Sequence, residues 1–498
     1  MKTLIRKIKN YKPSKYICYL YFFVPLFICS ISNVSKENDI WFLLKHGEYI
    51  LKRGFPHIEP LSMHQNFSFV MQQWLSSIIF YLSHKTFSQY GILLVMLITN
   101  ILILYFLYKL CMLISENRFR LSIIITCITD IFLLLFMIPR PWIFTMLNLI
   151  IVLYIMELFY KKNNRKALYF LPLISLIQIN IQSSMWFMLF IFMLPYIVCL
   201  FIEKEQLNKN NIINISLIII LMFICGFINP YGIDNILYIF NSYGNYYINN
   251  TVTEMQAISL SESKSLFYSH LFYIILLIQL LIYIFCKKGK FELRHLFLFL
   301  GVTFLGLKNI RSIWIFMIGT IPFLSSYLKP YFKKLSFKEE NLELEPDERK
   351  KYYLVIVILC IYTCGVSVIA NSKFTNKLEK GIDAIYNTSN VNAKTTVYTS
   401  YNNGSYAEYR NLKPYIDSRA EIFIKKNNHK EDIMKEYYLV YNGYTSYDKF
   451  INKYKFDYMI IMKNEAIYNS ALKDKNYKSI YYSKKYKYRV FERIVDRK

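Results

Sequence analysis

The stretch at residues 91–114 reads GILLVMLITNILILYFLYKLCMLI and contains one charged residue, Lys109. A membrane-spanning helix needs about 20 mostly apolar residues, so this stretch predicts a span. A shorter apolar run, WLSSIIFYLS at 74–83, precedes it and ends at His84. Counted as a span, the shorter run gives twelve spans in the chain; left out, it gives eleven. The other ten apolar runs lie at 16–33, 121–138, 143–160, 167–181, 184–202, 212–229, 268–286, 295–308, 311–328 and 352–370.

The composition of the whole chain fits a polytopic membrane protein. Of 498 residues, 55% are apolar and 19% charged, whereas an ordinary soluble domain is roughly 45–50% apolar and about 25% charged. The formal charge of +27 accompanies long apolar runs, which argues against a nucleic-acid-binding protein. The 18% aromatic content argues against disorder. All nine cysteines lie in apolar runs, so the sequence predicts neither a disulfide framework nor a zinc site.

Charge in the connecting segments decides between eleven and twelve spans. Short cytoplasmic loops are enriched in Lys and Arg, and the first fifteen residues carry six of them, so the N-terminus is predicted to be cytoplasmic. With eleven spans, the basic loop at 161–166 also lies inside; with twelve it would face out. We therefore predict eleven transmembrane helices in residues 1–370, in the plasma membrane. Residues 34–90 form the first outer loop, and 74–83 form a helix on the outer interface.

Residues 371–498 differ from the rest, because they are polar and contain turn signals in place of long apolar runs. Short β-type runs predict strands at 395–398, 458–462 and 486–491. Helical periodicity predicts helices at 430–440 and around 447–453. A small α/β domain fits this pattern. With eleven spans before it, the domain is extracytoplasmic.

Acidic residues follow the first predicted span at short distance. Glu37 and Asp39 come within six residues of its end, and Glu59 lies further along the same loop. A carboxylate at that depth is partly desolvated, which raises its pKa and suits it to general-base work. The same carboxylates, Asp39 and Glu37 first, could instead hold a divalent cation such as Mg²⁺ or Mn²⁺. A solvated loop without chemical function is the third interpretation.

Further motifs follow in a fixed order along the chain. They are Asp39-x-Trp41, Glu59-Pro60-Leu61-Ser62, Trp74-Leu75, Arg140-Pro141, Asn180, Asn229-Pro230-Tyr231-Gly232, Thr253-Glu254, Arg311, Asn402–Tyr406 and Tyr415–Ala420. This order resembles a bacterial family of polytopic membrane proteins related to the GT-C superfamily, whose glycosyltransferases use polyprenyl-phosphate-linked sugars.

The resemblance implies a mainly α fold, a GT-C-like helical bundle with a small extracytoplasmic domain. It also implies transfer of a sugar from a polyprenyl-phosphate donor in the membrane to a glycan, lipid or protein acceptor of the cell envelope. In such enzymes an acidic residue of the first outer loop acts on the acceptor hydroxyl or holds a metal, and Asp39 matches that position. Glu37 and Glu59 are the other predicted catalytic carboxylates.

Three cations lie at outer span ends in turns otherwise poor in charge: Arg140, Lys308 and Arg311. Arg binds phosphate with two parallel hydrogen bonds, so these residues are predicted to contact the donor phosphate. Two alternatives exist for these three side chains: they extend to the membrane interface, or they pair with Asp39 or Glu254. The remaining predicted substrate-binding residues are Glu254, Asn180 and Gln182.

Three positions depart from the family pattern. Leu43 stands where the family has His, Gln73 where it has Glu, and Gln182 where it has His. Loss of these groups argues against metal binding and against activity. It favours an alternative, non-catalytic function: a transporter or flippase for a lipid-linked glycan, or a glycan-binding membrane protein. In the last domain, Asp417 and Arg419 are predicted to form an internal structural pair.

Overall fold

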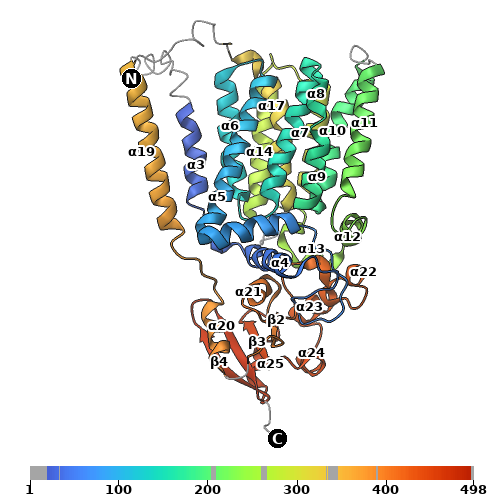
Figure 1. Ribbon diagram of the computed structural model, residues 1–498, viewed down its shortest axis with the longest axis vertical. Helices are drawn as coiled ribbons and strands as arrows, with labels where there is room; N and C mark the ends of the chain where they lie inside the picture. Colours follow the sequence, from blue (N-terminus) through green and yellow to red (C-terminus); the bar gives the residue numbers. More distant parts are fainter. Residues whose placement is uncertain are drawn as a thin grey trace.

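The computed structural model describes residues 19–32, 34–203, 209–259, 266–332, 334, 346–388 and 391–494. They form a bundle of long helices with a smaller α/β domain at one end (Figure 1). Each of the eleven predicted spans corresponds to a helix or to consecutive short helices. Seven of the described helices are long and apolar enough to cross a membrane. The predicted architecture, a helical bundle with a small α/β domain, is therefore confirmed.

The bundle helices follow the apolar runs because a long apolar segment satisfies its backbone polar groups internally as a helix. They are η1 (Leu20–Phe22) with α3 (Phe23–Ser30), α5 (Trp74–Ile114), α6 (Phe119–Leu133) with η3 (Leu134–Phe136), α7 (Trp142–Lys162), α8 (Arg165–Leu168) with α9 (Leu171–Ile181), η4 (Ser183–Met185) with α10 (Trp186–Ile202), α11 (Lys209–Gly226), α14 (Leu266–Phe285), α15 (Leu293–Lys308), η7 (Ile310–Ser312) with α16 (Ile313–Gly319) and α17 (Ile321–Tyr327), and α19 (Pro346–Ala370).

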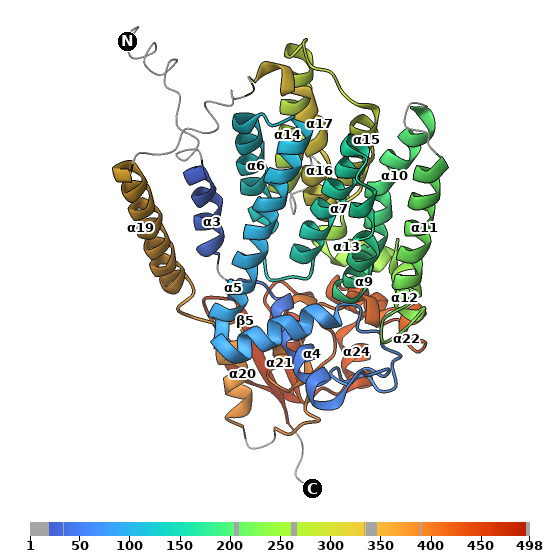
Figure 2. The ribbon, with the colours of Figure 1, turned by 45° about the horizontal axis from the view of Figure 1, so that its top comes forward.

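Helix α5 joins the short run at 74–83 to the next span through a sharp bend. Phe87 (φ −127°, ψ 18°) and Ser88 (φ 53°, ψ −145°) leave the helical region. The bend needs a glycine, because a Cβ at Gly91 would lie 1.9 Å from the carbonyl oxygen of Ser83. The first arm lies across the end of the bundle, and the second arm runs along it (Figure 2). The helix that contains 74–83 is thus a separate arm, joined to the following span at two non-helical residues.

Helix α4 (Asp39–Arg53) lies against the first arm of α5, and the α/β domain covers its other side. A Cβ at Gly47 would lie 2.4 Å from the carbonyl oxygen of Ser77, so the two helices cross at close range. On the opposite side, the Trp41 ring contacts that of Tyr406, with ring centroids 4.8 Å apart. The start of α4, which carries Asp39, is therefore fixed between bundle and domain.

The α/β domain is built on a five-stranded mixed sheet of order β2-β1-β3-β5-β4. Strand β1 is parallel to β2 and β3, and β5 is antiparallel to β3 and β4. The predicted strands at 395–398 and 458–462 match β1 and β3; β5 begins at Tyr488, because Lys487 (φ 53°) lies in the preceding turn. Strands β2 and β4 were not predicted. The strands are β1 (Thr396–Tyr398), β2 (Lys413–Pro414), β3 (Tyr458–Met462), β4 (Tyr477–Ser483) and β5 (Tyr488–Arg493).

Short helices complete the domain and the loops that meet it. Within the domain, two helices correspond to the predictions at 430–440 and 447–453, α23 (Ile433–Tyr441) and α24 (Tyr447–Tyr454). The others are α20 (Glu379–Tyr386), η9 (Tyr401–Asn403), α21 (Gly404–Tyr409), η10 (Ala420–Phe423), α22 (Lys425–Asn428) and α25 (Tyr468–Lys473). The loop after α11 contributes α12 (Asp234–Ser242), α13 (Tyr246–Thr251) and η6 (Thr253–Met255).

Basic loops gather at the end of the bundle away from the α/β domain. At the end away from the domain, the Lys161 ammonium donates to the carbonyl of Ile114 (3.0 Å) and Arg118 to that of Phe332 (2.9 Å), so the basic loops meet there. At the domain-facing end, the first loop is joined to the domain by Arg419 and Glu59. By the loop-charge rule, the basic end is predicted to be cytoplasmic and the domain-facing end external.

Candidate active site

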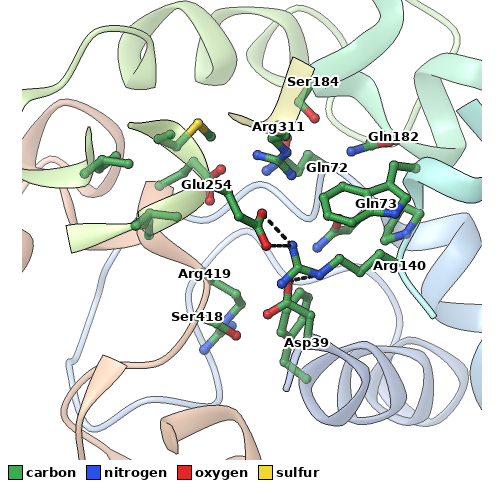
Figure 3. A pocket seen from close by; sticks show the side chains of 18 of the residues that line it. Asp39, Gln72, Gln73, Arg140, Gln182, Ser184, Glu254, Arg311, Ser418 and Arg419 are labelled. Atoms are coloured by element: carbon green, nitrogen blue, oxygen red, sulfur yellow. Dashed lines mark hydrogen bonds and ion pairs between the residues drawn. The ribbon is translucent and has the colours of Figure 1, made fainter. Parts of the chain in front are cut away.

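A cavity of about 240 Å³ lies where the domain-facing end of the bundle meets the α/β domain. Figure 3 shows its side chains converging from segments that are far apart in the chain. The start of α4, the turn before α7, the loop through η6, η7 and the segment 418–421 all contribute. The predicted substrate or catalytic residues that line it are Asp39, Arg140, Gln182, Glu254 and Arg311.

Arg140 lies in the turn just before α7 and is surrounded by three carboxylates. Its guanidinium is 2.7 Å from a Glu37 oxygen, 3.0 Å from Asp39 and 2.7 Å from Glu254. It also lies 4.6 Å from the ring centroid of Trp142. Although burial lowers its pKa, the carboxylates raise the pKa of Arg140 well above the ordinary value. Of the alternatives considered for Arg140, pairing with Asp39 and Glu254 is therefore the observed one.

Asp39 opens α4 and directs its carboxylate into the cavity, beside Arg140 (Figure 3). Burial raises the pKa of this carboxyl to about 7. Arg140 lowers it, Glu37 and Glu254 raise it, and a hydrogen bond with the Ser418 side chain lowers it. A carboxyl with a pKa near 7 exchanges its proton readily at neutral pH, which suits it to general-base work.

Arg311 approaches the cavity from η7, at the end of the bundle. The Asn309 side chain accepts a hydrogen bond from the Ser312 N–H (2.9 Å) and fixes this turn. The Arg311 guanidinium lies 5.5 Å from the Trp142 ring, so Trp142 contacts both cavity arginines. Its Nε is buried without a hydrogen-bond partner, and Arg311 forms no ion pair within the described residues. Since buried donors are normally paired, the Nε of Arg311 is available to donate a hydrogen bond.

Neutral amides occupy the two cavity positions at which the sequence departs from the family pattern. Gln73 and Gln182 both line the cavity. The Gln182 side chain accepts a hydrogen bond from the Thr145 hydroxyl (2.8 Å), and its backbone carbonyl accepts one from Gln178 (3.0 Å). Gln182 is therefore held in place by its neighbours and presents an uncharged surface to the cavity.

The carboxylates at this site do not fit a divalent cation. Glu37, Asp39 and Glu254 all point at one guanidinium, that of Arg140, which already supplies the positive charge at their centre. Over the part of the chain that the structure describes, no three His, Cys, Asp or Glu side chains are grouped as metal ligands would be. No catalytic step is therefore assigned to a metal.

Ser418 and His46 are among the cavity residues that the sequence does not predict as site residues. Ser418 comes from the α/β domain and hydrogen-bonds Asp39. His46 accepts a hydrogen bond from Arg419 (3.0 Å), while its Nδ1 is buried without a partner. Burial and the nearby Arg419 hold the pKa of His46 well below its ordinary value, so the ring is neutral. The spacing of seven residues between Asp39 and His46 is two helical turns and would have placed both on one helix face.

Four predicted site residues lie outside the cavity lining. Glu37 contacts Arg140 from behind Asp39. Glu59 is buried against Arg419 (2.9 Å). Lys308 is exposed at the end of α15, 5.2 Å from the Phe304 ring. Asn180 accepts a hydrogen bond from the Trp74 indole (2.9 Å) and joins α9 to α5. Their predicted catalytic or binding roles gain no support from this placement.

No family model and no curated protein sequence matches the chain. Solved structures, however, are similar in fold. The apo oligosaccharyltransferase of Archaeoglobus fulgidus superposes with a TM-score of 0.50 at 12% identity, over 90% of this chain and 70% of that chain. ArnT from Cupriavidus metallidurans, bound to undecaprenyl phosphate, superposes with a TM-score of 0.52 at 9% identity, over 96% and 97%. Both are GT-C glycosyltransferases. The chain is thus similar in fold to these enzymes, and it is a multi-pass membrane protein with a GT-C-like fold.

Proposed function

We propose that the protein is a glycosyltransferase of the bacterial cell envelope. It transfers a sugar from a polyprenyl-phosphate-linked donor to a glycan, lipid or protein acceptor on the outer face of the membrane. One observation carries the proposal: a single cavity at the end of the bundle is lined by Asp39, a carboxyl with a pKa near 7, and by Arg311, whose Nε is buried without a hydrogen-bond partner. The undecaprenyl phosphate bound by ArnT supports a lipid carrier of this class.

The chemistry follows from the placement of these groups. The acceptor hydroxyl oxygen attacks the anomeric carbon of the donor sugar, and Asp39 takes the hydroxyl proton. The bond between the anomeric carbon and the phosphate oxygen breaks, and the electron pair leaves with the polyprenyl phosphate. Arg311 stabilises the charge on the departing phosphate through charge-assisted hydrogen bonds. Arg140 positions Asp39 and keeps part of its population ionised, so it acts through Asp39 and does not bind the phosphate itself.

The proposal is tested by separating sugar transfer from lipid transport. Purified protein is reconstituted into proteoliposomes with undecaprenyl phosphate carrying radiolabelled hexoses, and membrane extract of the native cells supplies the acceptor. Label that leaves the lipid fraction, together with released undecaprenyl phosphate, supports transfer. Labelled lipid that crosses the bilayer unchanged, with no release, contradicts the proposal and favours the transporter or flippase alternative.

Arg311→Gln is expected to lower kcat/KM for the lipid-linked donor about 10- to 100-fold, the value of a lost hydrogen bond to a charged group. The loss should appear in both donor KM and kcat, because the phosphate carries one negative charge in the bound donor and gains a second as it departs. The same substitution at Lys308 tests the other cation at this end. It should change kcat/KM little, because Lys308 is exposed outside the cavity. Initial rates against donor concentration measure both variants; an equal or larger effect at Lys308 contradicts the assignment to Arg311.

A further inference from the structure

A group of tyrosines from two distant parts of the chain meets on the surface beside the cavity. Tyr246 and Tyr247 open α13, Tyr438 lies on α23 and Tyr444 follows α23. The Tyr438 ring centroid is 6.1 Å from that of Tyr246, 5.7 Å from Tyr247 and 6.4 Å from Tyr444. We refer to these four residues as the tyrosine patch.

Tyr246 and Tyr444 of the patch face solvent, whereas Tyr247 and Tyr438 are half-buried and Tyr247 also packs against the hydrophobic core. Tyr246 is 62% exposed and Tyr444 73% exposed. The chain contains 45 tyrosines, so one exposed tyrosine alone says little. The rings of Tyr246, Tyr247 and Tyr444 each contact that of Tyr438, and the contacts join segments about 190 residues apart. They form one aromatic surface that is exposed at Tyr246 and Tyr444, and exposed apolar surface of this kind marks an interaction site.

The patch connects two hollows of the surface. Ile248 and Thr251 of α13 line the cavity with Asp39, so Tyr246 and Tyr247 lie within about one helical turn of that cavity. At the other side of the patch, a second hollow of about 620 Å³ begins at the residues that flank Tyr444 and extends between α24 and α25. Its lining is largely polar and includes Ser446, Asp448, Ser470 and Asp474.

We propose that the tyrosine patch binds an extended glycan, the acceptor chain of the proposed reaction, and directs its end into the cavity. The proposal rests on the proposed function for the identity of the glycan as acceptor. The C–H face of a pyranose ring carries partial positive charge and packs against the negative face of an aromatic ring, while phenol hydroxyls bond sugar hydroxyls. Tyrosine gives this contact at low entropic cost, since it has two side-chain torsions. Three consecutive sites, the cavity, the patch and the polar hollow, require a ligand several sugars long.

Binding is tested without turnover, using the full chain in nanodiscs. Saturation-transfer difference NMR is recorded with maltohexaose, cellohexaose and chitohexaose. At least one hexaose should show transfer to its ring C–H protons, and Tyr246→Ala and Tyr438→Ala should each weaken its Kd about tenfold, the loss of one aromatic contact. Tyr486→Ala is the matched control, because Tyr486 is also exposed (40%) but lies in the β4–β5 turn, and its Kd should stay unchanged. No transfer with any hexaose, or equal Kd values in all variants, overturns the proposal.

Lipid is the other occupant that exposed tyrosines meet, since tyrosines are enriched at membrane interfaces. Tyr246→Trp in nanodiscs of brominated lipid distinguishes the two. The added indole should keep its fluorescence; quenching by the brominated chains would overturn the glycan proposal.

Failure of the proposed function gives a different result from failure of the patch proposal. If the hexaose binds through the patch but the wild-type protein transfers no sugar, the proposed enzymatic function is wrong and glycan binding stands. If sugar is transferred and the acceptor KM is unchanged in Tyr438→Ala, the proposed function stands and the role of the patch is wrong.

Discussion

Asp39→Asn is expected to lower sugar transfer by about 10²- to 10⁴-fold, the usual contribution of a positioned general base. Asparagine keeps the shape of the side chain and its hydrogen-bonding oxygen near Arg140, but it has no site for the acceptor proton. The loss should therefore fall on kcat, with donor KM nearly unchanged. Initial rates with radiolabelled undecaprenyl-phosphate sugar measure both parameters. Wild-type turnover in Asp39→Asn would remove Asp39 from the mechanism.

A pH profile gives the same prediction a second readout. The base works in its deprotonated form, and the pKa of Asp39 is about 7. Wild-type activity should therefore be low at pH 5.5, rise through about pH 7 and level off above it. The residual activity of Asp39→Asn should lack this rise. The matched control is Glu48→Gln on the same helix, whose carboxylate pairs with Lys45 and Lys52 away from the cavity; it should keep both the rate and the rise.

The membrane domain could be predicted in detail because its signals are local. Each apolar run is long enough to specify a helical span by itself, whatever it packs against. Loop charge then predicts which end of each span is cytoplasmic. The bend at Phe87 and Ser88 is different, since it depends on a close approach between Gly91 and the Ser83 carbonyl that no pattern records. Strand β4 is not predicted for a related reason: its sequence, YKSIYYS, does not alternate apolar and polar residues, and its pairing with β5 is what makes it a strand.

The candidate site could be predicted only in part. Asp39, Arg140 and Arg311 were found from their position at span ends, and all three line one cavity. Lys308 has the same sequence signal as Arg311 but lies on the other side of a turn, where its side chain faces outward. Glu59 forms an ion pair with Arg419, which lies 360 residues further along the chain. A pairing over that separation has no local signature, so the sequence alone left Glu59 among the catalytic candidates.

The pair predicted between Asp417 and Arg419 belongs to a larger buried cluster that joins the first loop to the α/β domain. Arg419 is 2.6 Å from an Asp417 oxygen and 2.9 Å from a Glu59 oxygen, and it also contacts Glu408 and His46. Burial raises the pKa of Glu408 well above its ordinary value, against the lowering effect of Arg419, so Glu408 holds its proton. The other two carboxylates, Glu59 and Asp417, have the Arg419 guanidinium as their cationic partner.

Arg419→Met is expected to destabilise the protein by about 3–5 kcal/mol, the cost of leaving buried charge without its partner. Methionine has a volume similar to that of arginine, so the loss of stability measures the effect of the missing charge and not that of a cavity. Thermal unfolding of the purified protein, followed by intrinsic fluorescence, measures the difference from wild type.

Arg410→Met supplies the matched comparison, since Arg410 also pairs with an aspartate of the same domain. Its partner Asp383 is 2.8 Å away, but the two side chains are 27% and 49% exposed. An exposed pair contributes about 0–1 kcal/mol, so Arg410→Met should unfold near the wild-type temperature. Equal losses in the two variants would mean that the Arg419 cluster is as well hydrated as a surface pair. A large loss confined to Arg419→Met, together with weakened activity below the unfolding temperature, would show that this cluster holds His46 and Ser418 against the cavity and makes the α/β domain part of the active site.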